Sequence, residues 1–517
     1  MKIRFDKYSL MLILFVLSLI IRFGYIYEMR ADPSFRILGR GLDSFHYHRD
    51  AEKIATGNIL LKGRSFQQAP GYSYFLAFIY KTLSKKLQVI RMIQAFLSSI
   101  SILMIFLIAL RLSKNLLSSF LSGIIWIFYA PSLFYDSLIL KTSITIFCLL
   151  CFIYFLILFI NDQKKGFLCG LFLGALIIIR PNFALLIFFI PLIYYFCSKK
   201  NIVLKKIFLL LFGILLLPSF LFVRNIILDQ PFYRLSSVGA RAVVQGQLPD
   251  AERLGWDDSI KGDKILESKS SLRTTLKEIS KEPFLWFKLQ IQKLKAFFSW
   301  YEYPNNYNFY LYKEKSRFLS IAFFSFIPVL IFSLYSIILL RNDFLYKKMY
   351  LLMLLSVFAC IFPFYPFSRF RMILALMLVL PSGMIFFDLS KKIMSKKYIS
   401  FVLWSLIIVL SFLYPHYLSK RFQLARHLDY FNFGNFHLEC RDFKNSEKYY
   451  RLSIQSNPEF LPSQNNLGIL YDSFGIYNHA RYLWEDSLKK DPNQDFIKLL
   501  LKRLEAKEAR EKVPKVR

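Results

Sequence analysis

The sequence predicts an all-α protein, in which a polytopic transmembrane helical bundle is followed by C-terminal α-helical repeats. The chain has 517 residues, and 55% of them are hydrophobic, which is too many for a soluble domain of this size. Apolar stretches of about 20 residues, the length that crosses a bilayer core, recur along it. Helices are the expected element because they satisfy their own backbone hydrogen bonds in lipid. After the last apolar stretch the chain becomes polar and repeats with a fixed period.

The apolar stretches predict about eleven membrane spans. In chain order they cover residues 8–27, 89–112, 116–134, 138–160, 167–179, 183–196, 207–223, 318–340, 350–364, 372–387 and 399–413. The first span follows a basic start without a small-residue cleavage site, so we expect an uncleaved helix rather than a signal peptide. The run from Gly71 to Leu83 is apolar but short. We expect a re-entrant or interfacial helix there, because a full span would move Lys114 across the membrane.

Short clusters of lysines between the spans predict the orientation of the bundle. With the spans above, all of them fall on one side: Lys2, Lys7, Lys114, Lys164, Lys165, Lys199, Lys200, Lys205, Lys206, Lys347, Lys348, Lys391, Lys392, Lys396 and Lys397. The positive-inside rule assigns that side to the cytoplasm. We therefore expect a multi-pass protein of the inner (plasma) membrane. The outer loops 30–88 and 224–317, and everything after residue 413, are then extracytoplasmic.

The net charge of +34 is explained by the same clusters. Lysines that flank apolar stretches orient helices and contact the anionic headgroups of membrane lipids. The sequence contains no nucleic-acid-binding module, so membrane lipids, and not nucleic acid, are the expected partners of this charge.

The polar tail predicts a second domain, residues 419–510, after a membrane domain that covers residues 1–418. Gly434 and Gly468 are 34 residues apart, and so are Pro458 and Pro492. This period, with small residues where two helices cross, resembles tetratricopeptide repeats. A last helix from Gln494 to Glu508 would cap the two units. Such repeats usually bind protein segments, so a protein partner or acceptor is expected, with a purely structural role as the alternative.

Charged residues gather at the extracytoplasmic ends of several spans. Asp43 lies in the first outer loop, in the segment LDSFHYHRDAE, and the others are Asp136, Lys141, Arg180, Arg224, Arg369 and Arg371. Ionisable groups near a membrane are costly and tend to face a cavity or a partner. Arginine suits phosphate because its planar guanidinium donates two parallel hydrogen bonds. The set predicts a site for an anionic lipid headgroup, and the alternative is that each arginine reaches the interface or pairs with a carboxylate.

The order of these segments resembles the GT-C membrane glycosyltransferases, in the bacterial branch similar to protein O-mannosyltransferases and lipid A aminoarabinose transferase. The resemblance covers roughly residues 8–390. It rests on five segments, which are the first outer loop with Asp43, Tyr47, Ala51, Gly57, Pro70 and Tyr72, the turn with Asp136 and Lys141, the RPN at 180–182, the Arg224-Asn225 pair, and the segment FSRFRMILALMLVLPSG with Arg369 and Arg371.

The resemblance implies transfer of a sugar from a polyprenyl-phosphate donor to a lipid, glycan or protein acceptor on the extracytoplasmic side. Asp43 is then the expected base, and Asp136 would share that role or hold a divalent cation. No cofactor is implied with certainty, and Mg²⁺ or Mn²⁺ stays an open alternative. The expected substrate-binding residues are Tyr47, His48, Lys141, Arg180, Arg224, Asn225, Arg369 and Arg371.

Three other functions remain open on the sequence. An enzyme similar to an O-antigen ligase or polymerase would share the lipid donor and the many spans. A transporter of lipid-linked sugars would also place basic residues in a cavity, but with charges near the bilayer midplane and related halves. A non-enzymatic anchor that displays the repeats would leave the outer loops and the arginines unexplained.

Overall fold

The computed structural model describes residues 6–63, 66–162, 165–198, 204–236, 238–248, 271–340, 344–419 and 424–511. Within these residues the regular secondary structure is helical, and the β contact is an isolated bridge between Tyr129 and Phe324. The chain divides into two compact units. The first contains residues 1–29, 43–305 and 312–421, and the second contains residues 30–42, 306–311 and 422–517.

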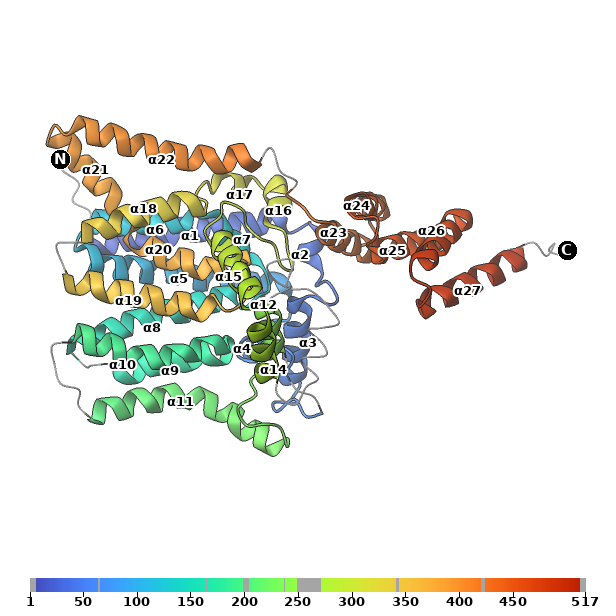
Figure 1. The fold of residues 1–517 in the computed structure, drawn as a ribbon, viewed down its shortest axis with the longest axis horizontal. Coiled ribbons are helices and arrows are strands. Elements are labelled where there is room, and N and C mark those ends of the chain that lie inside the picture. Colours follow the sequence, from blue (N-terminus) through green and yellow to red (C-terminus); the bar gives the residue numbers. More distant parts are fainter. Residues whose placement is uncertain are drawn as a thin grey trace. The chain divides into compact units, whose positions relative to one another are not determined.

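Helices long and apolar enough to cross a membrane make up the first unit, which confirms the all-α polytopic membrane class. Among the described residues six segments meet this criterion: α1 (Lys7–Met29), α5 (Leu87–Ser113), α8 (Thr142–Asp162), α11 (Leu204–Ile227), α20 (Ser368–Ser382) with α21 (Met384–Met394), and α22 (Tyr398–Ser419). Shorter apolar helices run beside them (Figure 1): α6 (Leu116–Ile127), α9 (Gly166–Ile179), α10 (Leu186–Cys197), α18 (Phe326–Leu339) and α19 (Phe344–Ile361).

Successive helices of the bundle run in opposite directions, so helix ends with lysines nearby gather at one end, on the left of Figure 1. They include the C-terminal ends of α5, α8 and α21 and the N-terminal end of α11. Lys2, Lys164, Lys199 and Lys200 lie outside the described residues. The opposite end holds α3 (Asp43–Ala55) and α4 (Gly71–Thr82). With 12 residues, α4 is about 18 Å long, less than the roughly 30 Å of a bilayer core, as a re-entrant or interfacial helix requires.

Two of the expected spans are interrupted, and the backbone groups at one break form hydrogen bonds with those at the other. The stretch 116–134 breaks after α6, and α7 (Ala130–Ser137) begins with a proline in its first turn. The stretch 318–340 breaks between α17 (Arg317–Ile321) and α18. Phe324 N donates to Phe128 O at 3.0 Å, and Ala130 N donates to Phe324 O at 3.0 Å. The breaks are stable because backbone groups freed from one helix find partners in the other, which an apolar environment demands.

Helices α9 and α11 pack closely because glycines remove the side chains between them. A Cβ on Gly170 would lie 2.1 Å from Leu210 O, and one on Gly174 would lie 2.5 Å from Ile214 O. From the other helix, a Cβ on Gly213 would lie 2.4 Å from Phe167 O. Small residues spaced four apart let membrane helices approach at their backbones. This contact holds the C-terminal end of α9, which leads directly to Arg180.

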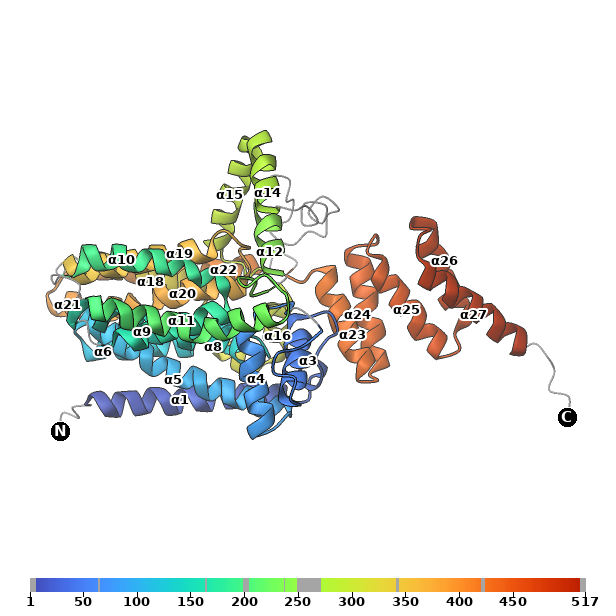
Figure 2. The ribbon, with the colours of Figure 1, turned by 90° about the horizontal axis from the view of Figure 1, so that it is seen from below.

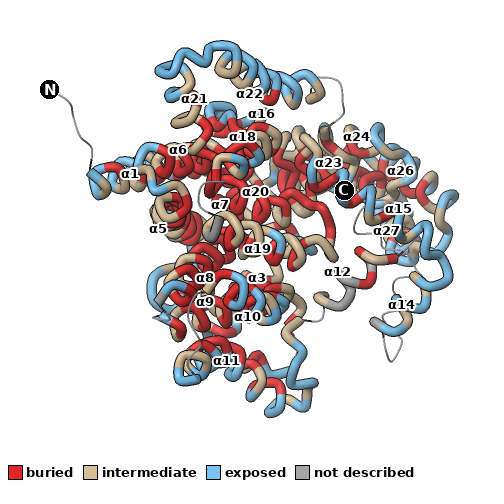
Figure 3. Tube along the Cα trace, turned by 60° about the vertical axis from the view of Figure 1, so that its left-hand side comes forward, coloured by how far each residue is buried: buried red, intermediate tan, exposed pale blue. Residues whose placement is uncertain are grey.

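Burial separates the centre of the bundle from its periphery (Figure 3). Of the apolar window in α20 and α21, 78% of the residues are buried, compared with 6% in α22. In α22 the apolar residues are exposed along nearly the whole length, as expected for a helix that faces lipid. The N-terminal turns of α20 are therefore in the interior, and any charge they carry must be neutralised there.

The loop between α11 and α18, which the sequence predicts to be an outer loop, adds helices at the end of the bundle that holds α3. They are α12 (Val238–Gln247), α14 (Ser271–Lys281), α15 (Pro283–Phe297) and α16 (Phe309–Lys315). Figure 2 shows α14 and α15 projecting sideways from the bundle. Residues 249–270, which the sequence places in the same loop, lie outside the described residues.

The second unit consists of the short α2 (Pro33–Arg36) and helical hairpins. The hairpin helices are α23 (His427–Glu439), α24 (Phe443–Ser456), α25 (Leu461–Ser473), α26 (Tyr477–Lys490) and α27 (Asp495–Glu511). Gly434 packs against the Tyr450 ring, and 34 positions later Gly468 packs against the Trp484 ring. A Cβ at either glycine would lie within 2.5 Å of the facing ring. The repeated contact explains the period in the sequence.

Candidate active site

Asp43 is the first residue of α3, and its carboxylate joins three parts of the chain. Gly41, two residues earlier, has φ +86°, a conformation in which glycine is favoured. The Oδ2 atom of Asp43 accepts a hydrogen bond from Nη1 of Arg369 in the first turn of α20. Its Oδ1 atom accepts a hydrogen bond of 2.8 Å from Nε2 of Gln68. The side chains of Asp43 and Arg369 are 15% and 16% exposed, so the pair is accessible only in part.

Arg180 lies beside this pair, between α9 and the 3₁₀ turn Pro181–Leu185. It is 2% exposed, and its guanidinium carbon lies 4.8 Å from the centre of the Phe370 ring. The Arg369 guanidinium carbon lies 5.5 Å from the centre of the same ring. Among the described residues the Nε atom of Arg180 has no hydrogen-bond partner. Burial, and then the charge of Arg369, lower the pKa of Arg180 to about 10. Arg180 is therefore a buried cation with an unused donor.

Lys141 and Tyr47 complete the cluster. Lys141 lies between α7 and α8, and its Nζ atom is 6.0 Å from the centre of the Tyr47 ring. Burial lowers the pKa of Lys141 well below its ordinary value, the charges of Arg180 and Arg369 lower it further, and Asp43 opposes the shift. Tyr47 is 1% exposed, and within the described part of the chain its hydroxyl has no hydrogen-bond partner.

The cluster of Asp43, Tyr47, Lys141, Arg180 and Arg369 contains three basic side chains and one carboxylate. The guanidinium groups of Arg180 and Arg369 both lie within 6 Å of the centre of one ring, and their charges repel each other. An excess of positive charge in a buried place is stabilised by an anion, and guanidinium groups hold phosphate especially well. The arrangement can therefore bind a phosphate group next to a carboxylate.

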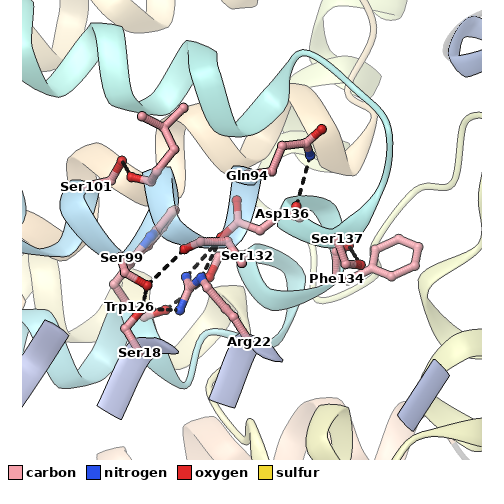
Figure 4. Close-up of polar contacts among 12 residues, drawn as sticks. Ser18, Arg22, Gln94, Ser99, Ser101, Trp126, Ser132, Phe134, Asp136 and Ser137 are labelled. Atoms are coloured by element: carbon pink, nitrogen blue, oxygen red, sulfur yellow. Dashed lines mark hydrogen bonds and ion pairs between the residues drawn. The ribbon is translucent and has the colours of Figure 1, made fainter. Parts of the chain in front are cut away.

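Asp136 lies in a different network, with Arg22 of α1 (Figure 4). The Nε and Nη2 atoms of Arg22 donate to Oδ2 of Asp136 at 3.0 and 2.9 Å, and the two side chains are 1% and 3% exposed. Nη1 of Arg22 donates to Ser18 Oγ at 2.9 Å. The structure thus couples Asp136 to α1, and its carboxylate is neutralised by Arg22 and not by the cations around Asp43.

A chain of buried polar contacts connects the two networks. Gln94 Nε2 donates to the backbone oxygen of Asp136 at 3.0 Å, and Gln94 Oε1 accepts from the Tyr72 hydroxyl at 2.6 Å. The Tyr72 ring then meets the Tyr47 ring edge to face, with their centres 4.9 Å apart. The backbone of Asp136 is connected to Tyr47 of the Asp43 cluster through these side chains.

Arg371 forms a third pairing, with Glu302. Their Nη2 and Oε1 atoms are 2.6 Å apart, and both side chains are buried. Arg371 also donates to Ser299 O at 2.7 Å, and Ser368 Oγ donates to Glu302. These contacts tie the start of α20, and with it Arg369, to the outer loop. The sequence reasoning missed Glu302, although an acid between aromatic residues in WYEYP is an unusual signal.

The other expected substrate contacts lie apart from the cluster. Arg224 Nε donates to Leu60 O at 2.8 Å, and Asn225 Nδ2 donates to Arg234 O at 2.7 Å. His48 Nδ1 is 2.7 Å from the Tyr80 hydroxyl, and its ring also approaches Glu52. Arg224 thus joins α11 to the loop between α3 and α4, Asn225 holds the loop that follows α11, and His48 joins α3 to α4.

Two side chains of the outer loop hold the connection from α19 to α20. Gln247 Nε2 donates to Pro363 O at 2.6 Å and its Oε1 accepts from Trp286 at 3.0 Å. Lys293 Nζ donates to Gly246 O at 3.0 Å and to Pro363 O at 3.2 Å, and burial lowers its pKa to about 7. Because this connection leads to Arg369, the outer loop helps to place that residue.

The described residues contain no group of three or more His, Cys, Asp or Glu side chains that could hold a metal ion. Asp43 is surrounded by cations, and Asp136 by Arg22 and serines. The residues that the sequence reasoning missed are Arg22, Gln68, Glu302 and Phe370. Of these, Arg22 was recognisable as a charge within an apolar span, which calls for a partner.

The fold and the site together define a multi-pass helical membrane protein with a buried, positively charged cluster beside one carboxylate. Residues 67–223 match the family described as dolichyl-phosphate-mannose-protein mannosyltransferase, which confirms the resemblance to protein O-mannosyltransferases over that segment. The match suggests a membrane glycosyltransferase that uses a polyprenyl-phosphate sugar donor. It includes Lys141 and Arg180, and it leaves Asp43 and Arg369 outside. No curated protein matches the chain.

Proposed function

We propose that the protein transfers a sugar from a polyprenyl-phosphate donor to a lipid, glycan or protein acceptor at the extracytoplasmic face of the inner membrane. The observation that supports it most is the cluster in which Asp43 lies among Lys141, Arg180 and Arg369. Transfer from a sugar phosphate needs both parts, a carboxylate that reaches the acceptor hydroxyl and cations that hold the phosphate.

The roles of the residues follow from the charges that change during transfer. Asp43 takes the proton of the acceptor hydroxyl while the oxygen of that hydroxyl bonds to the sugar C1. The bond from C1 to the phosphate oxygen breaks, and its electron pair leaves with the polyprenyl phosphate. Arg180, Arg369 and Lys141 stabilise this departing charge, which is the largest electrostatic demand of the step. Tyr47 contributes a buried hydroxyl at the same place.

Arg180→Gln tests the donor side of the site. We expect the KM for the polyprenyl-phosphate sugar to rise about 10- to 100-fold, because a hydrogen bond to a charged group contributes roughly 1.5–3 kcal/mol. The fold should persist, because the Nε atom of Arg180 has no partner within the described residues. Initial rates with radiolabelled hexose or aminopentose donors, in membranes that contain the protein, measure the change.

The matched control is Arg111→Gln, which removes another arginine that lies over an aromatic ring, 5.6 Å from the centre of Tyr154 at the lysine-rich end of the bundle. Its donor KM should stay at the wild-type value. An unchanged KM in Arg180→Gln would remove Arg180 from the donor site.

We further propose that the helical repeats of the second unit are tetratricopeptide repeats that recruit a protein partner or acceptor. The packing of Gly434 on Tyr450 and of Gly468 on Trp484 supports the repeat. Deletion of residues 422–517 should leave donor-dependent hydrolysis or transfer to a soluble test acceptor intact and abolish co-purification of the partner. Transfer and partner capture that both stay at wild-type levels would contradict the recruiting role.

A further inference from the structure

We propose that the donor phosphate replaces Asp43 as the partner of Arg369. Binding of the donor would then break the ion pair between Arg369 and Asp43 and leave the Asp43 carboxylate free to act as the base. In the structure Arg369 is paired with Asp43, and with the donor bound it would be shared between Arg180 and the phosphate. The inference rests on the proposed function, because it requires a polyprenyl phosphate in this cluster.

The first observation concerns the carboxylate. Both oxygens of Asp43 are engaged in the structure, Oδ2 by Arg369 and Oδ1 by Gln68. An ion-paired carboxylate is a weaker base than a free one, because the cation favours its ionised form. The pair as it stands therefore restrains the residue that must accept the acceptor's proton.

The second observation concerns Arg180. It is 2% exposed and the charge of Arg369 acts on it directly, yet its Nε atom has no hydrogen-bond partner among the described residues. Both guanidinium groups contact the Phe370 ring, at 4.8 and 5.5 Å from its centre. A phosphate between them would supply the missing acceptor and remove the repulsion of the two cations.

These two observations have one consequence for Arg369. Arg369 donates to Asp43, and it shares the Phe370 ring with Arg180, whose Nε atom has no partner among the described residues. One anion can therefore replace the other with little movement of the backbone. Gln68 keeps its hydrogen bond to Oδ1 during the exchange and holds the carboxylate in place. The pKa of Asp43 then rises, which strengthens it as a base only when a donor is present. An acceptor bound without a donor would remain unactivated.

Labelling of carboxylates with dicyclohexylcarbodiimide tests the exchange, because this reagent reacts with the protonated carboxyl group. The purified full-length protein in detergent is labelled with and without undecaprenyl phosphate, and the adducts are quantified by peptide mass spectrometry. Loss of an adjacent cation raises a carboxylate pKa by about 1–3 units. We expect the lipid to accelerate labelling of Asp43 by about tenfold or more.

The Arg22–Asp136 pair gives an internal control in the same digest, because its carboxylate is also held by an arginine but lies outside the cluster. Labelling of Asp136 should not respond to the lipid. Arg369→Gln should label rapidly at Asp43 with or without lipid while Asp136 stays protected, which also shows that this variant is folded.

Lipid binding is followed in parallel by native mass spectrometry. If undecaprenyl phosphate binds and labelling of Asp43 does not change, or falls, the exchange is wrong while the proposed transferase stands. If undecaprenyl phosphate does not bind, both the exchange and the proposed function are wrong.

Discussion

Asp43→Asn is expected to lower sugar transfer by about 10²- to 10⁴-fold, which is the usual contribution of a positioned general base. Asparagine has nearly the same shape, and its single side-chain oxygen can still accept the hydrogen bond from Arg369 while its amide group faces Gln68, whose own amide can turn to accept from it, so the helix start should remain in place. It cannot take the acceptor's proton. The loss should therefore appear in kcat, and binding of the polyprenyl-phosphate donor should weaken little or become tighter, because a negative charge beside the phosphate is removed.

The measurement is transfer from a radiolabelled polyprenyl-phosphate sugar in membranes, at saturating and limiting donor concentrations. Glu52→Gln is the matched control, because Glu52 is on the same helix but its side chain is 42% exposed and adjoins His48. That control should transfer at the wild-type rate. A wild-type kcat in Asp43→Asn would show that another group is the base and would reopen the role of Asp136.

Asp136→Ala is expected to destabilise the protein by about 3–5 kcal/mol, because it leaves the charge of Arg22 buried without its partner. Arg22 is 1% exposed and lies within α1, and among the described residues Asp136 is the carboxylate that accepts its hydrogen bonds. We expect a lower midpoint of thermal denaturation in detergent and less folded protein in the membrane. Both readouts are independent of transfer activity.

The double variant Arg22→Met, Asp136→Leu separates a structural role from a catalytic one. Apolar residues of similar volume often replace a buried ion pair without loss of stability. If Asp136 acts only through Arg22, the double variant should recover both the denaturation midpoint and the transfer rate of the folded protein. Recovery of the midpoint without recovery of transfer would instead place Asp136 in the reaction.

Asp43 and Asp136 show how much of the site can be predicted from the sequence. Both carboxylates lie next to an apolar stretch on the predicted outer side. The sequence pattern therefore gives their positions along the chain but not the side chains that they contact. The structure separates them by their partners, since Asp43 meets three cations whereas Asp136 meets Arg22. The same holds for the arginines, because Arg180 keeps an unused donor while Arg371 is paired with Glu302.

The sequence by itself determined the class of the fold. Hydrophobic length leaves helices as the spanning element, because a helix satisfies its own backbone hydrogen bonds in lipid. Glycines and prolines that recur 34 residues apart are visible along the chain. Only the tertiary structure decided which charges meet. Residues 43, 141, 180 and 369 come from four segments, and their pairing depends on how helices pack, as at Gly170, and on where two spans break, as at Phe324. Contacts between distant segments follow from shape and backbone satisfaction in three dimensions, which hydropathy along one chain does not encode.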